Sequence, residues 1–263
     1  MGLRDRPPKV AVVLAGTRGI GRACAERLAA DGHAVVTCGR QQETLDQVLA
    51  DLRSAGARAE GLVADVSDEA AAAGVVDHAL DAFGRVDVLV ANCGGPRPGT
   101  FEELSTEDWY DAFRLTFLSV VASVRRALPP MKEQGRGRIV VIGSSSTRAP
   151  LKGLTTSNAL RPALDGLVKS LAVELAPCGI TVNMACPGKV DTDRVRELDE
   201  RRASQSQRGY LEQREATERA IPAGRYGRPE EVAALVGFMA SDAAAYLTGQ
   251  SVLVDGAHVP TLP

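Results

Sequence analysis

The 263-residue sequence lacks the features that mark membrane, secreted or nucleic-acid-binding proteins. None of its apolar runs approaches the ~20 residues that a membrane-spanning helix requires. The opening MGLRDRPPKV has no apolar signal-peptide core, so we expect no secretory leader. The formal net charge is −2 and like charges form no block, which argues against the basic face of a nucleic-acid-binding protein. We therefore expect neither a membrane nor a nucleic acid as a partner.

Cysteine and histidine are also scarce. The cysteines lie scattered in apolar stretches without a CxxC pair, at positions 24, 38, 93, 178 and 186. An odd, dispersed set of this kind predicts reduced, buried thiols in a cytoplasmic protein rather than disulfides. The histidines, His33, His78 and His258, show no metal-ligand spacing, so we expect no metal site.

What the sequence does contain is a regular alternation of short β-branched runs and longer helical patterns. The predicted strands are 10–15, 34–38, 57–65, 86–92, 138–144, 180–186 and 250–255. The predicted helices are 20–31, 42–55, 69–83, 106–134, 157–177 and 229–240, with Ser105 and Asp108 as a capping box before the fourth. This alternation is typical of βαβ units, so we predict one α/β domain over 1–263. Its fold class is a doubly wound, Rossmann-type sandwich around a seven-stranded, mainly parallel sheet.

Residues 191–227, here called the lid segment, break this alternation because they are highly charged and too long for a simple connection. The lid segment follows the end of a strand, where open α/β sheets bind ligands, so we predict that it covers a substrate. Its seven arginines between 194 and 219 suggest an anionic substrate. Acidic residues interleave with them, however, and a solvated pair of amphipathic helices with i,i+4 ion pairs is the favoured alternative.

A glycine-rich turn, AGTRGIGRA, joins the first predicted strand to the first predicted helix. Such a turn lets the backbone approach a pyrophosphate at the helix N-terminus. The stretch resembles the T-G-x-x-x-G-x-G motif of the short-chain dehydrogenase/reductase family. Leu14 and Ala15 stand at the family's Thr and first Gly, so we expect the turn to form with a reshaped first corner. The resemblance implies cofactor contacts from Gly16, Thr17, Arg18, Gly19, Ile20 and Gly21.

The resemblance extends along nearly the whole chain. Asp65-Val66 is similar to the family's adenine-contacting pair, and Asn92-Cys93-Gly94 is similar to its Asn-Ala-Gly element. Asn183 and the stretch from Pro187 to Thr192 resemble the nicotinamide-side loop, and residues 246–256 resemble the last strand. The resemblance therefore implies further cofactor contacts from Asp65, Val66, Asn92, Gly94, Pro187, Gly188, Val190 and Thr192.

The end of the second predicted strand indicates which dinucleotide is used. Enzymes that use NAD place a carboxylate there for the ribose 2′-hydroxyl, whereas a 2′-phosphate requires cations. The strand ends in Cys38-Gly39-Arg40 without an acid, and Arg18 adds a second cation inside the glycine turn. A guanidinium can bind two phosphate oxygens together. We therefore predict NADP(H) as the cofactor.

The active site departs from the family pattern. The resemblance implies a catalytic Ser, Tyr, Lys and Asn, and alignment places Ser144, Ser157, Arg161 and Thr116 at these four positions. Only the serine is kept. An aliphatic hydroxyl ionises far less readily than a phenol of pKa ~10, and arginine stays protonated, so Ser157 and Arg161 cannot act as the Tyr–Lys pair does. Arg161 can still hold ribose hydroxyls or a substrate carboxylate.

Two explanations of this departure stay open. The site has either been rebuilt around Ser144, Ser157 and Arg161, or it has lost its activity. Tyr210 in the lid segment is a candidate replacement acid, although a packing role is the favoured interpretation, and Lys152 is a candidate cation near the mouth. The first hypothesis is an NADP(H)-dependent oxidoreductase acting on a small-molecule carbonyl or alcohol. The alternatives are a non-redox lyase, isomerase or cyclase, and a silent nucleotide-binding subunit.

The fourth predicted helix suggests a homo-oligomer. It is apolar on more than one face, through Leu115, Phe117, Leu118, Val120 and Val121. A helix of this kind must be buried on more than one side. The family resemblance places this helix at a subunit interface and implies a tetramer.

Overall fold

The computed structural model describes residues 8–261, and within them a single parallel sheet has the strand order β3-β2-β1-β4-β5-β6-β7. Every neighbouring pair of strands is parallel. The strands are β1 (Val10–Val13), β2 (Ala34–Gly39), β3 (Ala59–Val63), β4 (Val88–Ala91), β5 (Gly137–Ile142), β6 (Ile180–Pro187) and β7 (Ser251–Val254). The predicted seven-stranded, doubly wound fold is confirmed.

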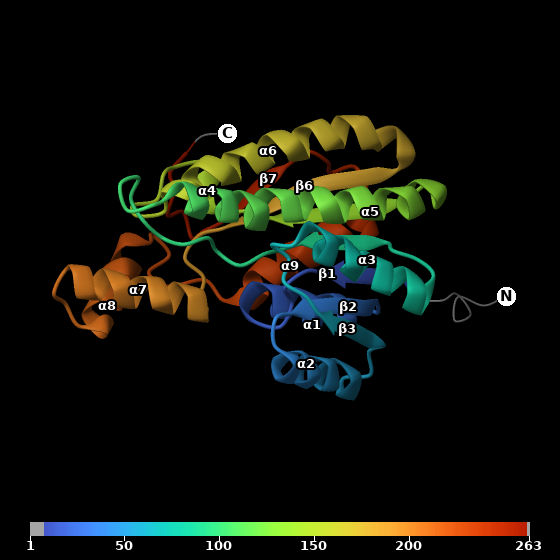
Figure 1. Ribbon diagram of the computed structural model, residues 1–263, viewed down its shortest axis with the longest axis horizontal. Helices are drawn as coiled ribbons and strands as arrows, with labels where there is room; N and C mark the ends of the chain where they lie inside the picture. The colour runs from blue at the N-terminus through green and yellow to red at the C-terminus, as the bar shows by residue number, and fades with distance from the viewer. Residues whose placement is uncertain (1–7, 262–263) are drawn as a thin grey trace.

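Helices cover both faces of this sheet (Figure 1). On one face lie α3 (Glu69–Phe83), α5 (Ser119–Glu133) and α6 (Thr155–Leu175), and on the other α1 (Gly19–Ala30), α2 (Gln42–Ser54) and α9 (Pro229–Ala240). The strands are buried on both sides, and every residue of β1 and of β4 is buried. This double burial explains why their sequences are continuous β-branched runs instead of alternating patterns.

The order of the strands decides where ligands can bind. The chain crosses from β3 at one side of the sheet to β4 beside β1, so the direction of winding reverses between β1 and β4. In open α/β sheets ligands bind at such a switch point, beyond the carboxyl ends of the strands. We call this side of the sheet the carboxyl edge.

The predicted helix 106–134 is interrupted. It consists of α4 (Thr106–Phe113), a π-helical turn over Arg114–Leu118, and α5. The Thr116 hydroxyl donates to the Ala112 carbonyl at 2.5 Å, and the Ser119 hydroxyl donates to the Leu115 carbonyl at 2.6 Å. Hydroxyl groups that bond to backbone carbonyls in this way compete with the helical pattern and bend it. The predicted Ser105–Asp108 capping box is confirmed at the start of α4.

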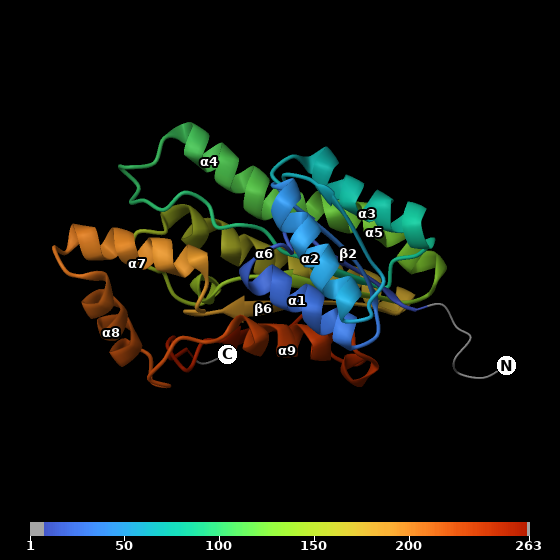
Figure 2. The ribbon, with the colours of Figure 1, turned by 90° about the horizontal axis from the view of Figure 1, so that it is seen from below.

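The lid segment forms two helices, α7 (Asp193–Gln205) and α8 (Tyr210–Ala220). Both views place them together at one end of the molecule, away from the layers that cover the sheet (Figures 1 and 2). The predicted helix pair is therefore confirmed, and it stands beyond the carboxyl edge, after β6. No helix within residues 8–261 is long and apolar enough to cross a membrane.

Candidate functional site

The predicted site residues lie along the carboxyl edge. Pairing of Val13 with Val90, of Ala91 with Val141, and of Ile142 with Ala185 aligns the ends of β1, β4, β5 and β6. The glycine turn, Asn92 and Ser144 follow the first three of these strands, and Pro187 is the last residue of β6. The fold thus brings together residues that are up to about 170 positions apart in the sequence, as expected for a parallel sheet.

The glycine turn after β1 forms as predicted. Ala15 has φ +49°, a left-handed conformation that suits glycine and costs an L-residue about 1–2 kcal/mol. The Asn92 side-chain amide donates to the carbonyls of Leu14 and Ala15, both at 3.2 Å, and supports this corner. A Cβ on Gly21 would lie only 2.3 Å from the Ala15 carbonyl oxygen. The end of β4 and the start of α1 therefore both depend on the shape of the turn.

The N-terminus of α1 is open to a ligand. Arg18 is the residue before the helix, and its side chain makes no capping hydrogen bond. The first N–H groups of a helix lack intrahelical partners, and together with the helix dipole they attract phosphate. An uncapped helix beside a glycine turn fits the pyrophosphate of a dinucleotide. Residues Gly16 to Gly21 would hold it there.

Both predicted 2′-phosphate ligands are exposed near the end of β2. The Arg18 guanidinium donates to the side chain of Gln41 at 2.7 Å. Arg40 has no carboxylate within ion-pair distance among residues 8–261. Arg40 does act on Asp65 at longer range. The pKa of Asp65 is lowered first by the hydrogen bond from the Ser67 backbone N–H, at 3.0 Å, and to a lesser degree by the charge of Arg40. Neither arginine would have to give up a carboxylate to bind a phosphate.

Ser144 and Ser157 come together through a residue that the sequence analysis missed. The Ser144 hydroxyl oxygen accepts from the Ser146 backbone N–H at 3.1 Å, and the Ser146 and Ser157 hydroxyls lie 3.3 Å apart. Ser146 and Ser157 are buried, whereas Ser144 is half-buried. The run of three serines after β5 was the available signal for Ser146. The three hydroxyls form one group at the end of β5.

Arg161 joins the ends of two strands. It is only 7% exposed, and it donates to the Ile142 carbonyl at 2.6 Å and to the Cys93 sulfur at 3.6 Å. Its buried Nε has no hydrogen-bond partner among the described residues. Thr116 is buried as well, but its hydroxyl is bonded within its own helix and makes no hydrogen bond to the other three predicted catalytic residues. The fold thus connects Ser144 and Ser157 through Ser146, whereas Arg161 bonds to the ends of β4 and β5 and Thr116 bonds within its own helix.

The loop after β6 approaches the glycine turn. The Thr192 methyl group lies 3.1 Å from the position that a Cβ on Gly19 would take. Thr192 also caps α7, accepting from the Val195 N–H at 3.4 Å. Asn183, by contrast, is fully buried in β6 and bonds to Leu247 and Gln250, so its contacts are structural. The loop, rather than the strand, therefore lies close to the glycine turn.

Arg194 links the lid segment to the loop after β4. Its guanidinium donates to the Pro96 carbonyl at 2.6 Å and packs against Gly95, where a Cβ would lie 2.7 Å from Arg194 Nε. Burial is the largest cause that lowers the pKa of Arg194. This contact holds the start of α7 against the cofactor side of the carboxyl edge.

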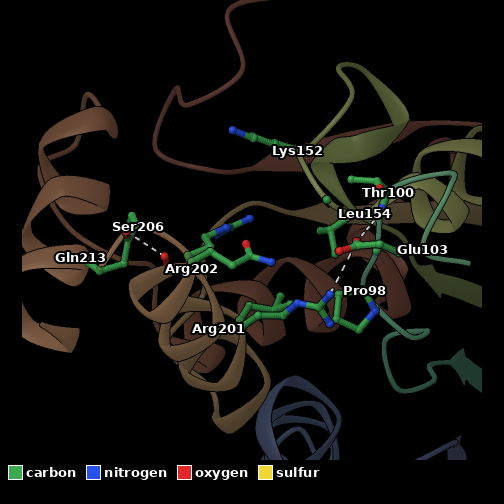
Figure 3. Close-up of a pocket in the computed structure, with 13 residues that line it drawn as sticks. Pro98, Thr100, Glu103, Lys152, Leu154, Arg201, Arg202, Ser206 and Gln213 are labelled. Atoms are coloured by element: carbon green, nitrogen blue, oxygen red, sulfur yellow. Dashed lines mark hydrogen bonds and ion pairs between the residues drawn. The ribbon is translucent and has the colours of Figure 1, made fainter. Parts of the chain in front are cut away.

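Two adjoining cavities lie beneath α7 and α8, and Figure 3 draws the residues that line the first of them. The first, of about 350 Å³, is lined by Pro98, Gly99, Thr100, Glu103, Lys152, Gly153, Leu154, Leu198, Arg201, Arg202, Gln205, Ser206 and Gln213. The second, of about 340 Å³, shares Lys152, Arg202 and Gln213 with it and adds Lys189. Tyr210 does not line either cavity, and its hydroxyl lies 3.5 Å from the Arg214 guanidinium. Volumes of this size suit a small molecule.

Lys189 was not selected by the sequence analysis. It stands two residues after β6, and no acidic side chain lies within ion-pair distance of it among residues 8–261. Burial is the main cause that lowers its pKa to about 8, and the nearby Arg202 lowers it further, against the opposing attraction of Asp199. Sequence alone offered no signal for Lys189, because its environment is made by the lid segment.

The chain is similar to known reductases over nearly its whole length. Residues 14–257 match the sequence model of a family described as enoyl-(acyl carrier protein) reductase. The 3-oxoacyl-(acyl-carrier-protein) reductase FabG of Escherichia coli (strain K12) is 37% identical over 249 residues, or 94% of this chain and 96% of FabG. A variant of actinorhodin polyketide ketoreductase with NADPH has a TM-score of 0.92 and 34% identity, covering 98% of this chain and 99% of its own. YwfH, an NADPH-dependent reductase involved in bacilysin biosynthesis, has a TM-score of 0.91 and 31% identity, covering 97% and 100%.

Proposed function

Because this chain belongs to the short-chain dehydrogenase/reductase family, we propose that it uses NADP(H) to interconvert a carbonyl and an alcohol on a small molecule. The relatives are reductases and include a structure with NADPH, which confirms the predictions of an oxidoreductase and of NADP(H) as its cofactor. We further propose that the substrate is a small carbonyl or alcohol compound and that Ser157 and Arg161 take the places of the family's Tyr and Lys.

The observation that carries the proposal is the combination at the glycine turn. Three features lie together there. The N-terminus of α1 has no side-chain cap, the turn leaves no room for a Cβ at Gly21, and neither Arg18 nor Arg40 has a carboxylate partner among residues 8–261. Each suits one part of a phosphorylated dinucleotide: the helix end suits the pyrophosphate, and the arginines suit the 2′-phosphate. The bound nicotinamide would supply or accept the hydride.

Ser144 is proposed to stabilise the oxygen of the reacting group. It stands at the carboxyl end of β5, where its hydroxyl can donate to a carbonyl oxygen as negative charge develops there. The new alkoxide requires a proton, and Ser157 cannot provide it by ionising. We propose that water delivers this proton through the Ser157 and Ser146 hydroxyls, each of which accepts one proton as it gives up another.

Arg161 is proposed to replace the family lysine as a binding group without acid–base function. Two of its nitrogens already hold the ends of β4 and β5 together, and Nε is left without a partner. A buried donor without a partner costs about 1–3 kcal/mol, so a ligand oxygen that reached it would bind favourably. A ribose hydroxyl or a substrate anion could supply this oxygen.

The experiment that tests the proposal restores the family pattern. Purified wild type, Ser144→Ala and the double variant Ser157→Tyr/Arg161→Lys are mixed with NADPH and a panel of carbonyl compounds, and the loss of NADPH absorbance is followed. We expect turnover by wild type, strong loss in Ser144→Ala, and activity on simple carbonyls in the double variant. Turnover without NADPH oxidation would instead favour a lyase, isomerase or cyclase. Full inertness of every variant, with unchanged NADPH affinity, would favour a silent subunit.

The assembly and the location are further parts of the proposal. We propose a homotetramer, supported by exposed apolar and aromatic side chains on α4 and α6, among them Tyr110, Phe113 and Val173 at 56%, 37% and 78% exposure. A monomer by light scattering at micromolar concentration would contradict it. We also propose a cytoplasmic location, in keeping with five cysteines that form no disulfide. The lid segment is proposed to cover the substrate.

A further inference from the structure

We propose that the substrate carries an anionic group, a carboxylate or a phosphate, which binds between Lys152 and Lys189 in the cavities beneath α7 and α8. The inference rests on the proposed function, since it assigns the part of the substrate that does not react. It assigns the anion-binding role to residues other than the lid arginines, for which the sequence had favoured a solvated, ion-paired helix pair.

The lid arginines are mostly occupied by acidic partners. All of the seven except Arg196 lie within 4.0 Å of a carboxylate, and the pairs are Arg194–Glu197, Arg201–Glu103, Arg202–Asp199, Arg208–Glu212, Arg214–Asp191 and Arg219–Glu215. Most of these pairs are exposed, as in the solvated helix pair that the sequence favoured. The arginine-rich run is therefore largely neutralised before any ligand binds.

Lys152 and Lys189, unlike most of the lid arginines, are not paired with acidic side chains among the described residues. Within residues 8–261 neither Lys152 nor Lys189 has a carboxylate within 4.0 Å. Lys152 is exposed on the loop before α6, and Lys189 is half-buried after β6. Both ammonium groups therefore line the second cavity, and Figure 3, which draws the first cavity, shows Lys152 on the loop before α6 and Arg202 on α7.

The acidic groups nearby are already engaged. Glu103 lines the first cavity, but it accepts from the Thr100 N–H at 2.8 Å and lies 3.6 Å from Arg201. Asp199 is buried under the second cavity, where it accepts from the Tyr226 hydroxyl at 2.5 Å and pairs with Arg202 at 3.3 Å. The second cavity has no acidic lining residue among those described. Asp199 still attracts Lys189, but it is also bonded to Tyr226 and paired with Arg202, so an incoming anion would meet a net attraction.

Each lysine follows a segment that is bonded to, or paired with, a segment carrying one of the three serines. The backbone N–H and carbonyl of Leu151, next to Lys152, bond to the Asn158 side chain at 2.9 Å each, and Asn158 follows Ser157 on α6. Lys189 lies just beyond the end of β6, which pairs with β5 up to Ile142, two residues before Ser144. Ser144, Ser146 and Ser157 line neither cavity, so a substrate held by the lysines must extend beyond the second cavity to bring its carbonyl to Ser144.

Burial gives a physical reason for a ligand here. A half-buried ammonium loses hydration without gaining a partner, and the lowered pKa of Lys189 reflects this loss. Charged groups in such a state are frequent at functional sites. An anion that binds between the lysines restores the missing attraction, and its binding is opposed only by the loss of its own hydration.

Binding without cofactor tests this inference separately from turnover. Calorimetry on the full chain measures a series of 2-oxo acids, their methyl esters, and phosphate monoesters of matched size. We expect the acids or the phosphate esters to bind more tightly than the neutral esters, and the tighter of the two anions identifies the source. Equal binding of acids and esters, or no binding of any anion, would overturn the inference.

Lysine variants complete the experiment. Lys189→Met and Lys152→Met keep the side-chain length and remove the charge, and each should weaken anion binding by roughly fivefold. Lys189→Arg should keep the affinity, and Lys132→Met, on the exposed end of α5, is the matched control. Unchanged anion affinity in both methionine variants would contradict the inference. Anion binding without any NADPH oxidation would instead contradict only the proposed function.

Discussion

The cofactor half of the carboxyl edge and its substrate half present different kinds of binding group. At the ends of β1, β2 and β4 the groups are mostly backbone: the N–H groups of α1 and a turn that excludes a Cβ at Gly21. At the ends of β5 and β6 they are side chains: Ser144, Ser157, Arg161 and Lys189. Backbone geometry limits which residues a position accepts, whereas a side-chain site can exchange residues while the fold stays the same. This difference is in keeping with the prediction that the catalytic positions of the family pattern are replaced, while the cofactor half keeps its turn even with Ala15 at the family's first Gly.

The cations of the two halves also differ, in how much of their hydration they keep. Arg18 and Arg40 are exposed, and each is available for a phosphate at little cost in hydration. Lys189 is half-buried and has already lost part of its hydration. A phosphate that binds to Arg18 and Arg40 binds to well-hydrated side chains. An anion that binds to Lys189 offsets the desolvation penalty that this ammonium already carries in the free protein.

The strongest test of the comparison is Gly21→Ala in the cofactor half. The new Cβ would lie 2.3 Å from the Ala15 carbonyl oxygen and 2.6 Å from Asn92 Nδ2, so the turn must shift. We expect NADPH binding to fall below detection by calorimetry, with a loss in stability of about 1–3 kcal/mol. Gly74→Ala in α3 is the control, since nothing lies within 4 Å of its Cβ, and it should gain about 0.5–1 kcal/mol. Wild-type NADPH affinity in Gly21→Ala would break the comparison.

Ser144→Ala should have the next largest effect, this time on turnover. Loss of a donor to the developing charge raises the barrier by about 2.7–4 kcal/mol. Ser157→Ala removes only a neutral hydrogen bond and should cost about 0.5–1.5 kcal/mol. The kcat of both variants is compared with that of Ser170→Ala, an exposed α6 serine whose loss should change nothing. Equal losses in Ser144→Ala and Ser157→Ala would remove the distinction between the two hydroxyls.

Arg40→Ala tests the 2′-phosphate end. Loss of one charge-assisted contact should weaken NADPH binding by about 1.5–3 kcal/mol. NADH has no 2′-phosphate, so its affinity for the same variant serves as the internal control and should stay unchanged. An equal loss for both cofactors would show that Arg40 acts through the fold instead of through the phosphate.

The pH dependence of anion binding separates the two halves further. Burial disfavours the charged form of Lys189, so its ammonium loses its proton as the pH rises through about 8. Lys152, Arg202, Asp199 and His258 belong to the same surroundings. Anion affinity should therefore fall by roughly fivefold between pH 7 and pH 9, the value of one partly exposed ion pair. The fall should be absent in Lys189→Met, and a flat profile in wild type would exclude Lys189 as an anion ligand.

The smallest effect is expected from Arg219→Ala in the lid segment. Its pair with Glu215, at 3.6 Å, is exposed on both sides. Such a pair contributes about 0–1 kcal/mol to stability, and its arginine does not line either cavity. Thermal melting and anion affinity should both match wild type. A weaker anion affinity in Arg219→Ala would return the anion-binding role to the lid arginines.

The sequence by itself determined the fold and the frame of the site. Strands buried on both faces appear as continuous β-branched runs, so the positions of β1 and β4 were visible locally. The glycine turn, Arg40 and Ser144 could also be predicted from the sequence, because each is identified by its place just after a strand. Ala15 is an exception to the preference for glycine at a left-handed position. Its conformation is supported by a hydrogen bond from Asn92, which is far away in the sequence.

Only the tertiary structure decided how the side chains are used. It joined Ser146 to Ser157, directed Arg161 toward Cys93 and Ile142, and interrupted the helix at Thr116 through a side-chain hydrogen bond. It also paired most of the lid arginines and, within residues 8–261, left Lys152 and Lys189 without a carboxylate partner. Secondary structure follows from short-range periodicity, but the charge state and the partners of a side chain depend on what the fold packs against it. That is the physical reason why we assign the anion-binding role to Lys152 and Lys189 instead of to the arginines that were conspicuous in the sequence.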